Sequence, residues 1–278
     1  MMKIVSKVSE MLAIQKDLLR PVGLVPTMGA LHIGHESLIN QSLKDNNSTV
    51  VSIFVNPSQF NAAADLEKYP KPLNTDLALL EKAGVDIAFL PENEEMYPKG
   101  FETWIEAEKT SVILEGQSRP GHFKGVATIV TKLFNIVKPD KAYFGQKDAQ
   151  QLNIIKRLNE DLNLFVSIID MPTIRDENGL AVSSRNAFLT DAERDAAHIL
   201  FQSLSQAKEM IMAGKYDAAI IRDRITKMLG DSDLISVDYV SISKLKSLEE
   251  LTIIEKPVLI SLAVIINNTR LIDNIIVE

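Results

Sequence analysis

Two histidines, His32 and His35, stand three positions apart in the segment PTMGALHIGH, which spans residues 26–35. At that spacing both imidazoles can lie on one side of a helix and reach the same ligand. Gly29 and Gly34 allow the backbone to approach a ligand closely, and the first turn of a helix favours a phosphate group. Imidazoles near a triphosphate can donate hydrogen bonds to charge that develops on its oxygens during attack at phosphorus. The alternative is a glycine turn that carries two incidental histidines.

Two further segments supply polar groups that suit small ligands. The segment FVNPSQF, residues 54–60, carries Asn56 and Gln59, whose amides can bind hydroxyl groups and carboxylates. Taken alone, that segment favours a proline-containing loop with solvated amides. The segment RPGHFKG, residues 119–125, places three potential cations and two glycines before a helix. This composition suits an anion, although many surface loops share it.

Two later segments add positive charge. In FGQKDAQQ, residues 144–151, Lys147 could bind a phosphate, Asp148 a ribose hydroxyl, and Gln151 a second substrate one helical turn further along. A glycine turn with Asp148 capping the next helix explains this segment equally well. In VSSRN, residues 182–186, two hydroxyls and the guanidinium that follows them suit β- and γ-phosphates. A loop that closes over a nucleotide there would exclude water from a hydrolysable intermediate.

Short apolar runs alternate with helical patterns from Val22 to about Asp170, which is typical of βαβ units. The runs are nearly continuous in apolar character, as parallel strands buried on both faces should be. We therefore predict an α/β fold with a Rossmann-like, doubly wound parallel sheet. Its expected strands are Val22–Val25, Thr49–Val55, Val85–Leu90, Lys141–Phe144 and Leu164–Ile169, and its expected helices are His35–Leu43, Asn74–Ala83, Val126–Val137 and Asp148–Leu162. Three of the polar segments follow expected strands, where an open α/β sheet binds ligands.

The pattern changes after Asp170, where a polar loop precedes two charged helices and three strand-like runs. We predict a second, smaller α+β domain, with domain ranges of 1–173 and 174–278. Asn267 and Asn268 suit a tight turn between its last two strands. The expected elements are helices Asp191–Ala213 and Asp217–Leu229 and strands Val237–Ile242, Val258–Ile266 and Arg270–Val277.

Composition narrows the class of protein. The formal net charge of -7 argues against a protein that coats nucleic acid, which needs a basic surplus. The absence of cysteine excludes disulfides, a thiolate nucleophile and cysteine-ligated metal, and it fits a reducing compartment. Residues 1–20 predict an amphipathic helix rather than a signal peptide, and the longest apolar stretch, Val258–Ile266, is too short to span a bilayer as a helix. We expect a cytoplasmic protein that binds neither nucleic acid nor membrane.

Taken together, the segments resemble the pantothenate synthetase (pantoate–β-alanine ligase) family over essentially the whole chain. PTMGALHxGH, FVNPxQF, a YP…D segment, RPGHFxGV, FGxKDxQQ and SSRN occur in the family's order and at family-like spacings. Such a joint match is far rarer than any one motif. The resemblance implies a catalytic domain of the HIGH-type nucleotidyltransferase superfamily, a smaller C-terminal domain that closes over the ATP site, and a homodimer.

The resemblance also implies a reaction and its catalytic residues. The carboxylate of pantoate would attack the α-phosphorus of ATP, and β-alanine would then displace AMP from the pantoyl-adenylate, so that no protein nucleophile is needed. His35 would be the proton donor, with His32 beside it. Lys147 and Arg185 would offset charge on the phosphates, together with Mg²⁺.

Binding residues follow from the same resemblance. Gln59 and Gln151 would hold pantoate, with Gln59 also near β-alanine. Further candidates for substrate binding are Asn56, Met28 and His122. The expected ATP-binding residues are Met28, Gly29, Ala30, Leu31, His32, Ile33, Gly34, His35, Gly145, Gln146, Lys147, Asp148, Ile174, Val182, Ser183, Ser184 and Arg185.

The chain departs from the family pattern at two positions. Thr75 precedes Asp76 where an acidic residue is common, and Val182 precedes the paired serines where Met or Leu is common. Asp76 would assist Mg²⁺, but the first departure leaves one fewer carboxylate, so that phosphates and water would hold most of the metal. Two other functions stay open: nucleotidyl transfer to a phosphate or an alcohol, since HxGH alone does not choose among superfamily reactions, and nucleotide binding without catalysis, in which the motif residues should have decayed.

Overall fold

The computed structural model describes residues 1–61 and 63–278. The chain forms two compact units, of which the first comprises Met1–Gly145 and Gln151–Met171 and the second comprises Gln146–Gln150 and Pro172–Glu278. The second unit thus begins close to the expected boundary after Thr173. It also includes the short segment Gln146–Gln150, which the sequence did not indicate.

The first unit is built on a six-stranded sheet in which every pair of neighbouring strands is parallel. The strand order is β1-β4-β3-β2-β5-β6. The strands are β1 (Lys3–Val5), β2 (Val22–Thr27), β3 (Ser48–Ile53), β4 (Ile87–Phe89), β5 (Lys141–Gly145) and β6 (Ser167–Met171). The prediction of a doubly wound parallel sheet is therefore confirmed.

The sheet buries both of its faces, because successive side chains of a strand point to opposite sides. Leu24 and Val50 belong to one apolar cluster, whereas their neighbours Val25 and Val51 belong to another. Helix α7 contributes to the first cluster, and helices α2 and α4 contribute to the second. This double burial explains why the strands are continuous in apolar character.

The helical segments of residues 1–171 are α1 (Val8–Ile14), α2 (Ile33–Asp45), the 3₁₀ turn η1 (Pro57–Gln59), α3 (Ala63–Lys68), α4 (Leu73–Ala83), α5 (Asn93–Met96), α6 (Glu115–Ser118), α7 (His122–Val137), the 3₁₀ turn η2 (Gln146–Asp148) and α8 (Ala149–Asp161). Of these, η2 belongs to the second unit.

The first twenty residues correct the prediction of one amphipathic helix. Lys3–Val5 forms the edge strand β1, which pairs with β4, and the helix α1 is confined to Val8–Ile14. A strand of three residues is too short to show the alternation that distinguishes a strand from the start of a helix. None of the helices that the structure describes combines the length and the hydropathy of a bilayer-spanning segment.

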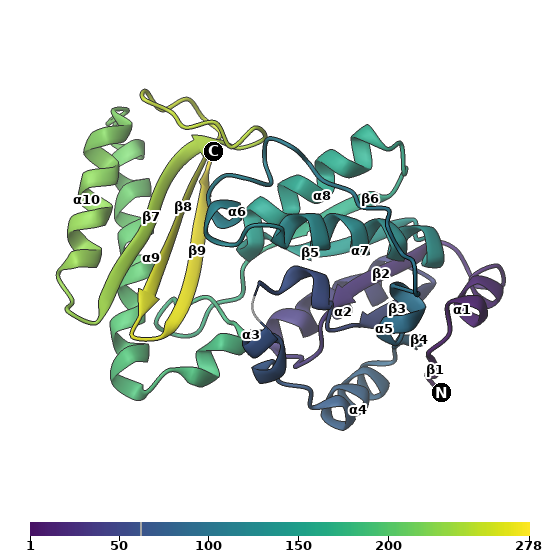
Figure 1. The fold of residues 1–278 in the computed structure, drawn as a ribbon. Helices are drawn as coiled ribbons and strands as arrows, with labels where there is room; N and C mark the ends of the chain where they lie inside the picture. The colour runs from purple at the N-terminus through teal and green to yellow at the C-terminus, as the bar shows by residue number, and fades with distance from the viewer. Residues whose placement is uncertain (62) are drawn as a thin grey trace. The chain divides into compact units, whose positions relative to one another are not determined.

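The second unit is an antiparallel sheet with two long helices along one face (Figure 1). Its strands are β7 (Ile235–Lys244), β8 (Val258–Ile266) and β9 (Thr269–Val277), and its helical segments are the 3₁₀ turn η3 (Ser184–Phe188), α9 (Asp191–Met212) and α10 (Ala218–Gly230). Thr190 and Glu193 form a capping box at the start of α9, and Asp217 caps α10. Asn267 adopts a left-handed φ of 52° in the turn between β8 and β9, as the sequence predicted. This unit confirms the predicted α+β character.

Candidate active site

The order of strands in the first unit reverses at β2. The chain runs from β2 outward to β3 and β4, and then returns to place β5 on the other side of β2. Ligands of open α/β sheets bind outside the carboxyl ends of the strands at such a switch point. The segment 28–35 follows β2, the segment 56–59 follows β3, and Gly145 ends β5. The topology therefore brings three of the predicted segments to one edge of the sheet.

The two histidines are oriented by backbone hydrogen bonds. His32 caps helix α2, and its Nδ1 accepts a hydrogen bond from the Gly34 N–H at 3.1 Å. His35 Nδ1 accepts from the His32 N–H at 3.3 Å, and the two ring centroids are 4.1 Å apart. A backbone N–H can only donate, so Nδ1 of each ring is an acceptor and a neutral ring carries its proton on Nε2. Both imidazoles are thereby prepared to donate from Nε2.

The loop before these histidines is held by a buried carboxylate. Asp76 lies in the first turn of α4 and is 2% exposed. Its Oδ2 accepts a hydrogen bond from the Ala30 N–H, and its Oδ1 accepts from the Leu31 N–H, both at 2.8 Å. Gly29 and Ala30 both adopt a left-handed backbone, with φ values of 81° and 51°. A Cβ on Gly29 would lie 3.0 Å from Asp76 Oδ2, so this turn needs glycine.

A hydrogen-bond network fixes the orientation of Gln59. Asn56 is 1% exposed, and its Oδ1 accepts from the Ser58 N–H and from the Tyr97 hydroxyl. Its Nδ2 donates to the Gly125 carbonyl at 3.2 Å and to Gln59 Oε1 at 3.0 Å. Because the Ser58 amide and the Gly125 carbonyl have fixed roles, the orientation of both side-chain amides is determined. Gln59 therefore presents Nε2, a donor, which contacts Met28 Sδ at 3.0 Å.

The main chain of Gln59 is held by His122, the first residue of helix α7, and by Arg119 just before that helix. His122 is buried, and its Nδ1 donates to the Gln59 carbonyl at 2.8 Å. Arg119 donates to the same carbonyl at 3.3 Å. Burial raises the pKa of Tyr97, although its hydrogen bonds with Ser58 and Asn56 oppose the shift. The hydroxyl that donates to Asn56 therefore stays protonated at neutral pH.

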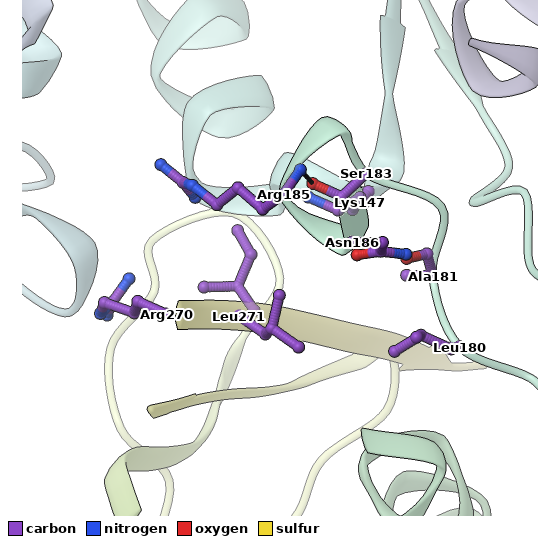
Figure 2. Close-up of a pocket in the computed structure, with 9 residues that line it drawn as sticks. Lys147, Leu180, Ala181, Ser183, Arg185, Asn186, Arg270 and Leu271 are labelled. Atoms are coloured by element: carbon purple, nitrogen blue, oxygen red, sulfur yellow. Dashed lines mark hydrogen bonds between the residues drawn. The ribbon is translucent and has the colours of Figure 1, made fainter. Parts of the chain in front are cut away.

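The second unit contains a pocket with three basic side chains, shown in Figure 2. The Arg185 and Arg270 side chains extend toward the same side of this view, and Lys147 lies beside Ser183. Ser183 Oγ accepts a hydrogen bond from the Arg185 N–H at 3.3 Å, which fixes the turn at the start of η3. Arg270 Nε donates to Asp238 at 3.0 Å, so part of its charge is compensated within the unit. The pocket is lined by Lys147, Leu180, Ala181, Ser183, Arg185, Asn186, Arg270, Leu271 and Ile272.

Strand β9 holds the segments that form this pocket. Asn274 Nδ2 donates to the Gln146 carbonyl at 3.1 Å and to the Lys147 carbonyl at 2.8 Å. The neighbouring Asp273, which is 2% exposed, receives two hydrogen bonds from the Arg175 guanidinium, at 2.7 and 2.9 Å. Charge-assisted bidentate pairs of this kind are strong and specific in geometry. Two consecutive polar residues of β9 thus position Lys147 and the loop that begins near Arg175.

Two of the predicted nucleotide-binding residues meet in that loop. The Val182 N–H donates to the Ile174 carbonyl at 2.9 Å, and Arg175 and Ala181 form an antiparallel bridge. The Arg175 guanidinium also lies over the Phe201 ring, 3.9 Å from its centroid. Residues 174–182 therefore form a closed, supported turn that leads directly into the paired serines.

Comparison with known proteins decides the family. The family model described as Pantoate-beta-alanine ligase matches residues 2–276.

The chain belongs to the pantoate–β-alanine ligase family.

Relatives and solved structures agree with this assignment. The chain is 50% identical over 280 residues to the pantothenate synthetase of Acetivibrio thermocellus, with 100% of both chains covered. It is similar to the crystal structure of pantothenate synthetase from Thermus thermophilus, with a TM-score of 0.93, 40% identity and 99% of both chains covered. A pantoate-beta-alanine ligase from Francisella tularensis, solved in complex with beta-gamma ATP and beta-alanine, gives a TM-score of 0.81 at 35% identity, with 99% of this chain and 98% of that chain covered. The chain is accordingly an ATP-dependent ligase of pantoate and β-alanine, the activity that the sequence predicted.

The predicted site residues of this ligase fall into two groups. Residues 28–35, Asn56, Gln59, His122 and Gly145 belong to the first unit, as does Gln151 on α8. The second unit contains the remaining predicted nucleotide-binding residues: Gln146, Lys147, Asp148, Ile174, Val182, Ser183, Ser184 and Arg185.

Sequence reasoning missed several residues that support the predicted segments of each unit. Tyr97, Arg175, Asp273 and Asn274 were not predicted, although each is hydrogen-bonded to a segment that carries predicted residues. A usable signal existed only for β9, where the dipeptide Asp273-Asn274 interrupts an apolar run and is buried. Buried polar residues in a strand normally have specific partners.

The described residues offer little that could hold a metal ion. Among the side chains that the structure describes, no three of His, Cys, Asp or Glu gather closely enough to form a metal site. Asp76, the predicted metal residue, is buried and accepts a backbone hydrogen bond on each oxygen. Mg²⁺ requires near-octahedral geometry and usually keeps several waters. A buried carboxylate whose two oxygens already accept backbone hydrogen bonds does not offer room for such a shell. Its surroundings therefore do not fit a metal ligand.

Proposed function

We propose that the chain joins pantoate to β-alanine in two steps. In the first, a carboxylate oxygen of pantoate attacks the α-phosphorus of ATP, and the bond to pyrophosphate breaks. In the second, the amine of β-alanine attacks the acyl carbon of pantoyl-adenylate, AMP leaves, and the nitrogen loses a proton to give pantothenate. The observation that carries this proposal is the histidine pair at the switch point of the sheet, with both rings oriented to donate from Nε2.

The histidines would stabilise charge on ATP. As the α-phosphorus is attacked, negative charge grows on the phosphate oxygens, and donors already in place lower the barrier without reorganisation. His35 is the proton donor of the proposal, because its Nδ1 already accepts the His32 N–H and its proton is directed to Nε2. His32, within 4.1 Å between ring centroids, acts beside it. The backbone of residues 28–34 lines the nucleotide site.

Gln59 and Gln151 would bind pantoate, with Gln59 also near β-alanine. The network around Asn56 fixes Gln59 Nε2, which contacts Met28 Sδ, as a donor, and a donor suits the carboxylate or hydroxyl oxygens of pantoate. Asn56 and His122 were predicted as substrate contacts. Both donate a hydrogen bond to Gln59 itself, so we assign them to orienting that residue.

Residues of the second unit would bind the rest of ATP. Lys147 and Arg185 line the same pocket as Ser183, and a point charge, a planar guanidinium and a hydroxyl together suit the β- and γ-phosphates. Asp148, which is half-exposed, can accept a hydrogen bond from a ribose hydroxyl. Gly145, Gln146, Ile174, Val182 and Ser184 complete the proposed nucleotide site.

Three broader expectations belong to the same proposal. Mg²⁺ enters with ATP and is held mainly by phosphate oxygens and water, where it would neutralise part of the triphosphate charge. The protein works in the cytoplasm, which the absence of cysteine supports. It functions as a homodimer, an expectation that rests on resemblance and is checked by light scattering coupled to size-exclusion chromatography.

The deciding experiment measures products with substrates omitted one at a time. Wild-type protein is incubated with ATP, Mg²⁺, pantoate and β-alanine, and AMP, pyrophosphate and pantothenate are quantified by mass spectrometry. We expect pantothenate and AMP in equal amounts only when both organic substrates are present. Pyrophosphate release that continues over many turnovers without β-alanine and gives no amide would indicate transfer to another acceptor, and an absence of turnover would indicate a nucleotide-binding protein without catalysis.

A further inference from the structure

Asp76 occupies a position that the proposed reaction does not use. It lies in the first turn of α4, where its N–H donates to the Pro72 carbonyl at 3.0 Å. Its side chain is 2% exposed, although the neighbouring Thr75 is exposed. A buried carboxylate carries a large desolvation cost unless hydrogen bonds compensate it. The partners of this carboxylate therefore explain why it is tolerated.

Those partners are consecutive backbone amides of the loop that precedes α2. Asp76 accepts from Ala30 on one oxygen and from Leu31 on the other, at 2.8 Å in both cases. Gly29, with its left-handed φ of 81°, donates its own N–H to Thr27 Oγ1 at 3.2 Å. Successive amides that point the same way form a concave site for an anion. In this chain Asp76 is the anion that fills it.

The backbone of this loop needs such support. Ala30 adopts a φ of 51°, which is uncommon for a residue with a Cβ and costs free energy that its surroundings must offset. Two residues later the chain reaches His32, the cap of α2, and then His35. A shift of the loop would move both imidazoles. Misplacement of reacting groups by about 1 Å can cost on the order of 100-fold in rate.

We propose that Asp76 is a positioning residue, which holds the Ala30 and Leu31 amides and thereby sets where His32 and His35 lie. It acts through the backbone and touches neither ATP nor metal. One consequence concerns the nucleotide site: the amides of Ala30 and Leu31 are occupied by Asp76, so phosphate contacts from this segment come from the imidazoles and from other groups. The inference rests on the proposed function only in assigning that loop to ATP.

Two substitutions separate positioning from metal binding. Asp76→Asn replaces one acceptor oxygen by an NH₂ group that faces a backbone donor, so at least one of the two hydrogen bonds is lost. Asp76→Glu keeps the carboxylate but lengthens the side chain by a methylene in a buried position. A metal ligand would be partly rescued by Glu, whereas a carboxylate fitted to two amides would not. Glu81→Gln, the same kind of change at an exposed position of α4, is the matched control.

Three readouts are measured on each variant. We expect pantoyl-adenylate formation to fall at least tenfold in both Asp76 variants, with a lower Tm, and to stay unchanged in Glu81→Gln. The affinity of the enzyme–ATP complex for Mn²⁺, measured by electron paramagnetic resonance, should stay within twofold of the wild type. A tenfold loss of Mn²⁺ affinity in Asp76→Asn that Asp76→Glu restores, with an unchanged Tm, would overturn the proposal.

Backbone hydrogen exchange tests the same inference without any assay of activity. We expect the amides of residues 30 and 31 to be strongly protected in the wild-type protein and to lose that protection in Asp76→Asn. Unprotected amides in the wild type would refute the assignment even if the variants failed to fold. Because this readout needs no substrate, it remains decisive if the protein proves to have a different activity.

Discussion

The histidine segment of the first unit and the basic pocket of the second, lined by Lys147, Arg185 and Arg270, are held by different kinds of contact. His32 and His35 are oriented by backbone amides within three positions of themselves. The pocket of the second unit depends on β9, whose Asn274 reaches the Lys147 carbonyl across 127 positions of the chain. Hydrogen bonds between neighbouring positions give a contiguous sequence motif. Hydrogen bonds between distant positions involve residues that are scattered along the sequence. The same comparison predicts where substitutions change chemistry and where they change binding or stability.

The largest effect is expected for His35→Ala. Loss of one donor to the developing phosphate charge should slow pantoyl-adenylate formation by about 100-fold or more. Helix α2 should remain, since its apolar contacts through Leu38 and Ile39 are untouched. The measurement is single-turnover formation of the adenylate, with circular dichroism as the check on folding.

Asn40→Ala, at an exposed position of the same helix, is the control for this substitution. Wild-type turnover in the His35 variant would remove that residue from the mechanism. It would also contradict the proposed contrast between catalysis by the first unit and ATP binding by the second.

A smaller effect is expected for Arg185→Lys in the second unit. Lysine keeps the charge but loses the planar fork, so the KM for ATP should rise about tenfold while kcat changes less. Steady-state kinetics over a range of ATP concentrations distinguish the two parameters. Arg157→Lys, on the exposed side of α8, should leave both unchanged. A fall in kcat as large as that of the His35 variant would show that the two regions do not divide the work as proposed.

Asn274→Ala tests the distant support of the pocket. The substitution removes hydrogen bonds to the Gln146 and Lys147 carbonyls and should lower the free energy of unfolding by about 1–3 kcal/mol. We expect the KM for ATP to rise severalfold as Lys147 loses its fixed position. Urea denaturation and ATP titration measure the two effects. Asn178→Ala, an exposed position in the same unit, is the control, and equal behaviour of the two variants would contradict a supporting role for β9.

The smallest effect concerns a buried tyrosine on β5. Burial raises the pKa of Tyr143 to about 12, while its hydrogen bonds with Asn46 and Asp45 act in opposite directions. The unfolded state ionises near pH 10, so the folded protein should lose stability as the pH rises from about 10 to about 12. Tyr143→Phe should reduce this loss and leave turnover at neutral pH unchanged. Thermal denaturation across that pH range measures the difference, and an identical slope in both proteins would contradict the assignment.

The fold was predictable where burial leaves a continuous or periodic pattern. Strands β2 and β3 are buried on both faces and read as apolar runs, and the turn at Asn267 is set by a residue that tolerates a left-handed backbone. Strand β1 was missed because three residues show no period. Strand β6 begins at Ser167, three residues later than expected, because Leu164 and Phe165 fall outside the paired register with β5.

The candidate site was predictable as a set of motifs but not as a network. The segment types indicated which groups could bind phosphate, because those groups are adjacent in sequence. The partner of a side chain was not visible in the sequence: Asp76 accepts from amides 45 and 46 positions away, and Asn56 donates to Gln59. Nearly every residue type has a backbone N–H. The sequence therefore does not show which residues donate to a carboxylate that accepts from backbone amides.

The link between β9 and Gln146–Lys147 has a consequence for protein synthesis. The Gln146 side chain bonds to Asn274, which is translated 128 residues later. At about 5–20 residues per second, that interval is on the order of ten seconds. Once Met171 has been translated, the first unit has all six strands of its sheet, while the segment that carries Lys147 still lacks the strand that supports it. A nascent chain on the ribosome therefore passes through a stage in which all strands of the parallel sheet are present and the basic pocket is still incomplete.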